Sequence, residues 1–423
     1  MTTNSITTSL QNKEIEAISK LDKELVRIIK GFLILGPLSW SKQVMDDFLA
    51  SVQKGQLQMP KVSYDKVDYK SKIKQLKLFL TKVSNKDHPA IRFLYNTAES
   101  YLDAYLILQG VGTRQVTKYS KKLYGSPKDL MPGYKKKNID IARYFLSVVE
   151  DYKFTVHNEP LIYSDHQFRK ALTERVKPII DQKKDPISIK VDNNISARAA
   201  AGPRYVKIRK GTRFSESDLI QLLHHEVAIH TLTYINGRKQ PILKSLGYNA
   251  PRTTATQEGL AVFAEYINLS IDLVRLKRIA LRIIAIHMAE QGANFIDLFR
   301  FYKAHGQDHE ESYYSAMRIF RGGVPEGGII FYKDNVYLRG LIEVEAFLTH
   351  AMHQGNIHDI ALLFSGKLTT DDADTLKEFA QDGHIIMPAY LPPWATRSSE
   401  LASHLAFNDV TEKFKLKENR KTD

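Results

Sequence analysis

The sequence predicts an α+β protein that is mostly helical, and two patterns carry this prediction. Apolar residues recur at helical spacing through most of the first 150 residues and again after residue 219. Between these regions, ISIKVDNN from Ile187 alternates apolar and polar residues, as a half-buried strand does. The chain has 423 residues, of which 43% are hydrophobic, which is enough for a large core and two or three lobes.

The first part of the chain is predicted to be an N-terminal helical region over residues 15–155. Residues 1–14 are rich in Thr, Ser and Asn, and we expect them to be disordered. From Ile15 to Leu33, apolar residues recur at helical spacing, which indicates the first helix. LYGSPKDLMPGYKKKN, from Leu123 to Asn138, is typical of a turn-rich connection between helices.

The second part, residues 156–395, is predicted to contain a small sheet followed by helices. ISIKVDNN, ISARAAAG and RYVKI are the expected strands. An edge strand of such a sheet can hold an extended peptide by backbone pairing. The last stretch, residues 396–423, becomes polar and ends in KFKLKENRKTD, so we expect a basic tail there.

Capping patterns give the expected limits of two helices in this second part. Ser215 and Asp218 have the spacing of an N-cap pair, so a helix is expected to begin there. Asn236-Gly237 is expected to end that helix. Thr254 and Gln257 have capping-box spacing at the expected start of the next helix.

Composition narrows the class of protein. The chain has no cysteine, so a tightly held metal must use His, Asp or Glu, and a reducing, cytoplasmic location is expected. We find no signal peptide and no apolar run long enough to span a membrane.

The formal net charge is +14. A lysine-rich solvated surface explains this charge best, and attraction to an acidic partner is the alternative; no specific nucleic acid is expected.

The chemistry is expected in LIQLLHHEVAIHTLTYINGRKQP, which contains the HExxxH pattern of His225, Glu226 and His230. The next predicted helix, TQEGLAVFAEY, carries Glu258. Two imidazoles and a later carboxylate are the ligands that Zn²⁺ uses when one position stays open for water. Because the chain has fourteen histidines, HExxxH alone is a weak signal, and Glu258 strengthens it. We expect one Zn²⁺ per chain, held by His225, His230 and Glu258.

The spacing of the two histidines makes a structural prediction. His225 and His230 are five residues apart, which on an ideal α-helix separates them by about 140° around the axis. One ion cannot bridge that separation, whereas a π-type turn would return both imidazoles to one face. We therefore predict a wide turn between them. Gly259 has no Cβ, so the two ligand-bearing helices are expected to approach closely there.

Three neighbouring residues have expected roles. Glu226 follows the first histidine, so it is expected to take a proton from the attacking water and pass it to the leaving amine. Glu265 lies seven residues after Glu258 and is expected either to bind the other N–H of a ligand imidazole or to be an ordinary carboxylate at the core edge. His224 is expected to be a bystander.

HHEVAIHTLTYINGRKQP, TQEGLAVFAEY, RIFRGG and FYKDNVYLRGL together resemble the QEGLA-motif proteins, the bacterial relatives of the microtubule-associated tyrosine carboxypeptidases. The resemblance continues weakly upstream through LYGSPKD and covers most of residues 80–395. It implies a zincin-like metallopeptidase in which His225, His230 and Glu258 are the zinc ligands and Glu226 is the catalytic glutamate. It also implies release of a C-terminal tyrosine, which animal members remove from tubulin.

A carboxypeptidase needs a group that binds the terminal carboxylate, and a guanidinium does this best. Arg321, Lys333 and Arg318 are the candidates for this role, although Arg318 and Arg321 are also open to a purely structural interpretation. Tyr332 and Tyr337 are the candidate catalytic donors near the developing oxyanion.

The sequence thus favours a zinc carboxypeptidase that releases a tyrosine-like residue from the C-terminus of a protein or peptide, and an acidic substrate is one option. The alternative is a non-enzymatic, basic helical binding or regulatory protein with a structural zinc. An endopeptidase is a third option, which an open cleft would favour. The oligomeric state stays open.

Overall fold

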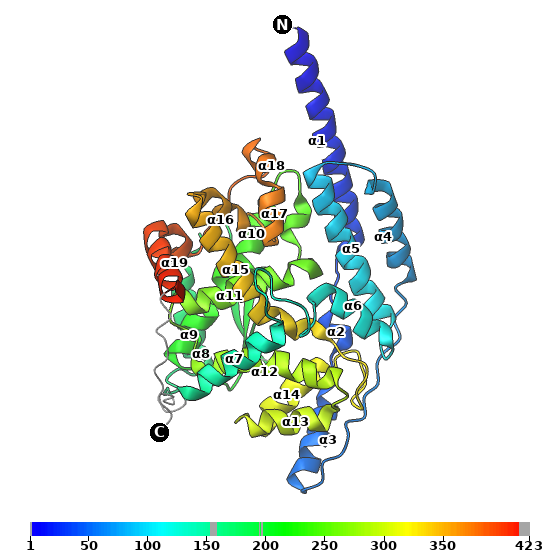
Figure 1. Ribbon diagram of the computed structural model, residues 1–423, viewed down its shortest axis with the longest axis vertical. Helices are drawn as coiled ribbons and strands as arrows, with labels where there is room; N and C mark the ends of the chain where they lie inside the picture. The colour runs from blue at the N-terminus through cyan, green and yellow to red at the C-terminus, as the bar shows by residue number, and fades with distance from the viewer. Residues whose placement is uncertain (1, 153–158, 194, 196–197, 414–423) are drawn as a thin grey trace.

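The computed structural model describes residues 2–152, 159–193, 195 and 198–413. It confirms a mostly helical chain with one small sheet (Figure 1). The N-terminal helices are α1 (Thr2–Ile29), α2 (Leu35–Leu38), α3 (Lys42–Gln53), α4 (Lys70–Val83), α5 (Pro89–Gln109), α6 (Arg114–Tyr124) and α7 (Asn138–Asp151).

Helix α1 begins at Thr2, so residues 2–14 are helical where we expected disorder. The physical reason is that extending an existing helix costs little once its later turns are fixed. Ile18 and Leu25 are fully buried and fix those later turns. The first turns of α1 project away from the body of the molecule in Figure 1.

The sheet has three strands: β1 (Ser188–Asp192), β2 (Ala199–Gly202) and β3 (Tyr205–Arg209). Their order is β1-β3-β2, with β1 parallel and β2 antiparallel to the central β3. Helix α8 (Asp165–Val176) packs on this sheet through Phe168 and Leu172, which share a core cluster with Val206 and Ile208 of β3. The predicted small sheet is therefore confirmed, and β1 and β2 are its edges.

One continuous helical rod follows the sheet and contributes to the same core cluster. It consists of α9 (Glu216–Leu222), the π-helix η2 (Leu223–Thr231) and α10 (Leu232–Lys239). The expected cap at its start is confirmed, because the Ser215 and Asp218 side chains each accept a bond from the other's backbone N–H.

The expected end of this rod at Asn236-Gly237 is wrong, because α10 continues to Lys239. The amide of Asn236 is buried and donates to the carbonyls of Phe364 and Tyr390, so it does not compete for its own backbone. Gly237 is needed for a different reason: a Cβ there would lie 2.2 Å from the carbonyl oxygen of Leu246.

The remaining elements follow this rod in the chain. They are η3 (Lys244–Gly247), η4 (Pro251–Thr253), α11 (Thr254–Ile267), α12 (Leu273–Glu290), α13 (Phe295–Ala304), α14 (His309–Ile319), η5 (Tyr332–Asn335), α15 (Val336–His353), α16 (Ile357–Leu363), α17 (Thr370–Thr375), α18 (Lys377–Gln381), η6 (Pro393–Thr396) and α19 (Ser398–Lys413). The expected capping box at the start of α11 is absent, since Thr254 donates to the carbonyl of Pro251 and Gln257 accepts from Thr233.

The larger core cluster draws residues from α1 and α5 as well as from α11, α12 and α15. The division of the chain near residue 155 therefore stays a prediction. Helix α19 occupies the first part of the expected tail, and residues 414–423 lie outside the described part of the chain. Within that part, no helix is long and apolar enough to cross a membrane.

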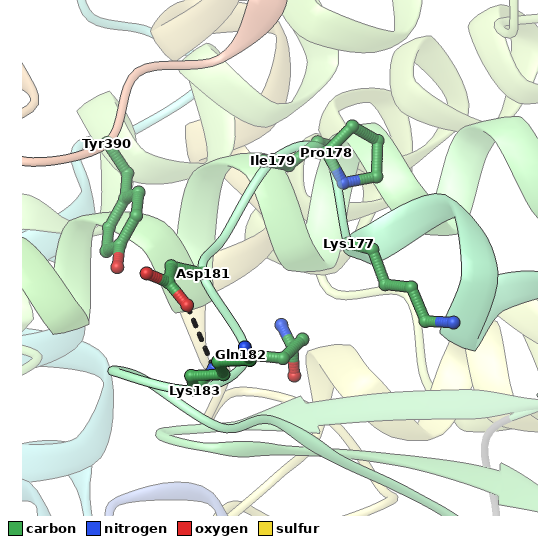
Figure 2. A pocket seen from close by; sticks show the side chains of 7 residues that line it. All are labelled: Lys177, Pro178, Ile179, Asp181, Gln182, Lys183 and Tyr390. Carbon is green, nitrogen blue, oxygen red and sulfur yellow. Dashed lines mark hydrogen bonds between the residues drawn. The ribbon is translucent and has the colours of Figure 1, made fainter.

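A depression of about 460 Å³ lies in the connection between α8 and β1 (Figure 2). Its lining contains none of the predicted site residues and consists of Lys177, Pro178, Ile179, Asp181, Gln182, Lys183 and Tyr390.

Candidate metal centre

The wide turn predicted from the histidine spacing is confirmed. His225 and His230 both lie in the π-helix η2, and their ring centroids are 5.0 Å apart. Because a π-turn spreads five residues over about one revolution, the two imidazoles return to one face. The hydroxyl of Thr233 donates to the carbonyl of Ile229 at 2.7 Å, within the turn that follows.

Glu258 completes the group from the neighbouring helix α11. The closest ligand atoms of His225, His230 and Glu258 all lie within 4.8 Å of one another. Nε2 of His225 is 3.8 Å from Oε2 of Glu258. The structure thus brings together the three side chains expected to bind zinc. Two imidazole nitrogens and one carboxylate oxygen match the donors of a catalytic zinc site.

The position of Glu258 depends on a contact between two helix backbones. A Cβ on Gly259 would lie 2.1 Å from the carbonyl oxygen of Gly340 in α15, and a Cβ on Gly340 would lie 2.0 Å from that of Ala255. The expected close approach at Gly259 is therefore real, but its partner is α15 and not the π-helix.

Glu265 binds the other nitrogen of His225, as one of its two expected roles required. Its Oε1 is 2.6 Å from Nδ1 of His225, and the carboxylate also accepts bonds from Gln221 and Arg275. Since a carboxylate can only accept, Nδ1 of His225 carries the hydrogen and Nε2 faces Glu258. Glu265 is fully buried, so its alternative role as an ordinary edge carboxylate is wrong.

The two histidines differ in their electrostatics. Burial lowers the pKa of His225, but its bond to Glu265 and the charges of Glu226 and Glu265 outweigh burial and raise the pKa to about 9. Burial, followed by the charges of His225 and Lys367, lowers the pKa of His230 to about 3. A metal binds the neutral form of both imidazoles, so its binding at this group would displace the extra proton favoured at His225.

Glu226 lies between the two histidines on the π-helix. Burial raises its pKa, the nearby Glu258 and Glu265 act in the same direction, and the charge of His225 opposes them. Burial, followed by the charge of Arg175, lowers the pKa of the adjacent His224 to about 4. The three-residue group does not include His224, as expected for a bystander.

Lys333 and Tyr337 lie beside this group. Nζ of Lys333 donates to Oε1 of Glu258 at 3.1 Å and lies 5.5 Å from the ring centre of Tyr337. Burial raises the pKa of Tyr337, as does Glu258, but the charges of Lys333, Arg318 and Arg282 outweigh them, so that its pKa is lowered. Tyr337 is thus electrostatically coupled to the candidate metal centre.

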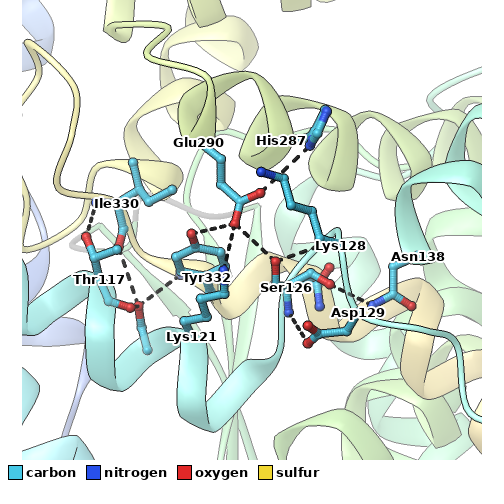
Figure 3. A network of polar contacts seen from close by, with 12 residues as sticks. Thr117, Lys121, Ser126, Lys128, Asp129, Asn138, His287, Glu290, Ile330 and Tyr332 are labelled. Carbon is cyan, nitrogen blue, oxygen red and sulfur yellow. Dashed lines mark hydrogen bonds and ion pairs between the residues drawn. The ribbon is translucent and has the colours of Figure 1, made fainter.

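Tyr332 points elsewhere. Its hydroxyl donates to Oε1 of Glu290 at 2.7 Å, and Ser126 and Lys121 bind the same oxygen (Figure 3). This set, hereafter the Glu290 network, packs the LYGSPKD turn against η5. The structure therefore does not bring the Tyr332 hydroxyl to the candidate centre, because Glu290 from α12 binds it.

The two candidate arginines differ in how far the protein uses their hydrogen-bond donors. Arg318 makes two bonds of 2.6 Å to the carboxylate of Asp334 and one of 3.2 Å to the hydroxyl of Tyr337, so its donors are largely used. Arg321 has a buried Nε with no hydrogen-bond partner among the described residues.

Sequence reasoning missed Lys367, which is only 3% exposed. Its Nζ donates to the carbonyl of His230 at 2.9 Å and to Oε1 of Gln257 at 2.8 Å, so it links the π-helix to α11. Burial lowers the pKa of Lys367 to about 7, against the charges of Glu258 and Glu226. Nothing in the sequence distinguishes this lysine from the many exposed ones.

The fold and this geometry define a helical protein with a His–His–Glu group of the kind that metallohydrolases use. A family model described as "Microtubule-associated tyrosine carboxypeptidase" matches residues 46–413, and the chain belongs to this family. The printed name of this family is that of a carboxypeptidase. Membership of the bacterial QEGLA-motif branch stays a prediction.

A curated relative has a matching name. The chain is 26% identical over 196 residues to the "Putative tyrosine carboxypeptidase MATCAP2" of Mus musculus. The match covers 45% of this chain and 36% of the relative, so the chain spans about a third of that protein's length.

Proposed function

We propose that this protein is a zinc-dependent carboxypeptidase that removes a tyrosine-like residue from a peptide or protein C-terminus. The observation that carries the proposal is the group of His225, His230 and Glu258, with ligand atoms within 4.8 Å of one another and Glu226 on the same π-helix. The family membership supports the same reaction class.

The donor set fits a zinc ion, which when bound would polarise the scissile carbonyl and make a water molecule nucleophilic near neutral pH. His225, oriented by Glu265, and His230 would hold the ion together with Glu258. Glu226 would take the proton from the attacking water and deliver it to the leaving amine. Tyr337 is the proposed hydrogen-bond donor to the developing oxyanion.

A zincin-like arrangement is part of this proposal. The metal-bearing rod lies directly after the sheet in the chain, and strand β2 contacts the π-helix. Since β2 is an edge strand, its free side can pair with an extended peptide and so align the peptide with the π-helix.

The test uses the full chain loaded with zinc and a library of peptide C-termini, with products identified by mass. We expect about one zinc per chain, loss of a single C-terminal residue, and complete inhibition by a chelator. Glu226→Gln should keep the metal and lose activity by about 10²- to 10⁴-fold. Glu216→Gln, on the same rod but paired with Arg175, is the matched control.

Two results would reject the proposal. Zinc-free protein after purification with added zinc would remove its basis. Bound zinc with no hydrolysis of any peptide would favour the non-enzymatic binding protein with a structural ion.

A further inference from the structure

Basic side chains outnumber acidic ones around Tyr337, beside the candidate metal centre, apart from Arg275 and Glu265, which pair with each other. The set, hereafter the cationic cluster, comprises Lys333, Arg318, Arg282, Arg321, Asp334 and Glu258. Four cations thus share two carboxylates. A buried charge without a partner is costly, so an excess of this kind indicates a missing anion.

Two of the four cations already have partners. Arg318 binds both carboxylate oxygens of Asp334, and Lys333 binds Glu258. These pairs account for both acids of the cluster. Arg318, which the sequence had put forward for substrate binding, is therefore mainly a support for Asp334 and Tyr337.

Arg282 and Arg321 each have a buried hydrogen-bond donor that is unpaired among the described residues. Arg282 is 8% exposed, its Nε lies 3.7 Å from Asp334, and its Nη1 has no hydrogen-bond partner among the described residues. Nε of Arg321 is equally buried and unpaired within the same part of the chain. Burial, followed by the charge of Arg318, lowers the pKa of both guanidinium groups to about 10.

Tyr337 connects Arg282 to the candidate metal centre. The guanidinium carbon of Arg282 lies 4.3 Å from the ring centre of Tyr337, and Lys333 lies 5.5 Å from the same ring while it binds Glu258. The guanidinium of Arg282 is thus one aromatic ring away from Lys333 and its partner Glu258, and Arg321 lies close enough to Arg282 and Tyr337 to interact electrostatically with both.

We propose that Arg282 and Arg321 bind the C-terminal carboxylate of the substrate. This inference rests on the proposed peptidase function, and it adds Arg282, which the sequence did not single out. Two guanidinium groups match the two oxygens of a carboxylate and bind it more specifically than a lysine does. An internal residue of a peptide has no main-chain carboxylate, so the pair selects chain ends and disfavours endopeptidase action.

The test compares two peptides that end in tyrosine and differ only in a free carboxylate or a carboxamide. Hydrolysis and fluorescence-detected binding are measured with the zinc-loaded full chain. The wild type should prefer the acid by roughly 10- to 100-fold, the value of a charged hydrogen-bond pair. Arg282→Gln and Arg321→Gln should each lose most of this preference. Binding and hydrolysis of the acid peptide should fall, whereas those of the amide peptide should stay the same.

Controls separate this loss from misfolding. Arg278→Gln changes an arginine one turn earlier on α12 that has its own partner, Glu311, and should keep the preference for the acid. Arg282→Lys and Arg321→Lys keep the charge and should restore part of the preference. Thermal unfolding of each variant checks that Arg318 still holds Asp334 and that the fold is intact.

Equal binding of acid and amide by the wild type would overturn the carboxylate subsite, whether or not the peptides are hydrolysed. An equal loss on both peptides in the Gln variants would overturn it as well. Preferential binding of the acid without hydrolysis would instead refute the peptidase function and support the anion subsite. The two proposals therefore fail in different ways.

Discussion

The candidate metal centre and the Glu290 network each surround a half-buried glutamate, and their contrast shows how partners define a role. Glu290 receives three donors on one oxygen: the hydroxyls of Tyr332 and Ser126 and the ammonium of Lys121. Glu258 receives one, from Lys333, and otherwise faces two imidazoles. A carboxylate oxygen that already accepts three donors of the protein is structural, whereas a carboxylate that faces imidazole nitrogens is suited to a cation.

The two regions meet in η5. Tyr332 and Lys333 are consecutive residues, yet the first reaches Glu290 and the second reaches Glu258. The Glu290 network therefore holds the segment that delivers Lys333. Substitutions in the two regions should separate metal binding from folding stability.

The largest effect is expected for Glu258→Gln. The amide replaces a charged ligand by a neutral one, so zinc affinity should fall by well over 100-fold while the fold is kept. Zinc titration by calorimetry and circular dichroism check this. Glu290→Gln, in the other region, should keep its zinc affinity. A similar loss of zinc affinity in this variant would contradict the separation of the candidate metal centre from the Glu290 network.

Glu265→Gln should weaken zinc binding less, by roughly 10- to 100-fold, because it removes the charged partner of His225 and leaves every ligand in place. Competition with a chelator of known affinity measures the change. An unchanged affinity would mean that the bond between Glu265 and His225 serves folding alone.

Glu290→Gln should change how stability depends on pH. Burial raises the pKa of Glu290, but Tyr332, Lys121 and Ser126 outweigh burial and hold it below 4.5. A lowered folded-state pKa stabilises the fold above about 4.5, and this contribution is lost as pH falls through the folded value. The variant should be less stable by about 1.5–3 kcal/mol at pH 7, with the difference shrinking in acid. Urea unfolding across pH 3–7 tests this, and a constant difference would contradict it.

Tyr332→Phe should have the smallest effect, about 1 kcal/mol of stability, because Glu290 keeps two other donors. Zinc affinity should be unchanged. Thermal unfolding and zinc titration are the measurements. A large loss of zinc binding would instead show that Tyr332 has a role at the candidate metal centre, as the sequence had suggested.

Helix geometry explains what could be foreseen. The five-residue spacing of His225 and His230 predicted the π-turn because 3.6 residues per turn leave no alternative for a shared ion. The position of Glu265 two turns after Glu258 predicted a role near the site, and its bond to His225 gives that role a partner. Each of these spacings lies within a single helical segment, so the geometry of that segment alone determines which residues share a face.

Long-range packing explains what could not. Arg282 and Lys367 are buried by helices distant in sequence, and nothing near them in the chain marks them as buried. Tyr332 and Tyr337 looked equivalent, and only the position of Glu290 on α12 separates them. Asn236 failed as a helix stop because carbonyls of residues 364 and 390 satisfy its amide.

The contact between Gly259 and Gly340 makes the centre sensitive to a change that touches no ligand. Alanine at 259 would place its methyl carbon 2.1 Å from the Gly340 oxygen, so α11 and α15 would separate by on the order of 1 Å. Metal–ligand distances tolerate only about 0.2 Å. The distance between α11 and α15 therefore sets the position of Glu258. A single added methyl group would be enough to move this carboxylate out of the range for coordination.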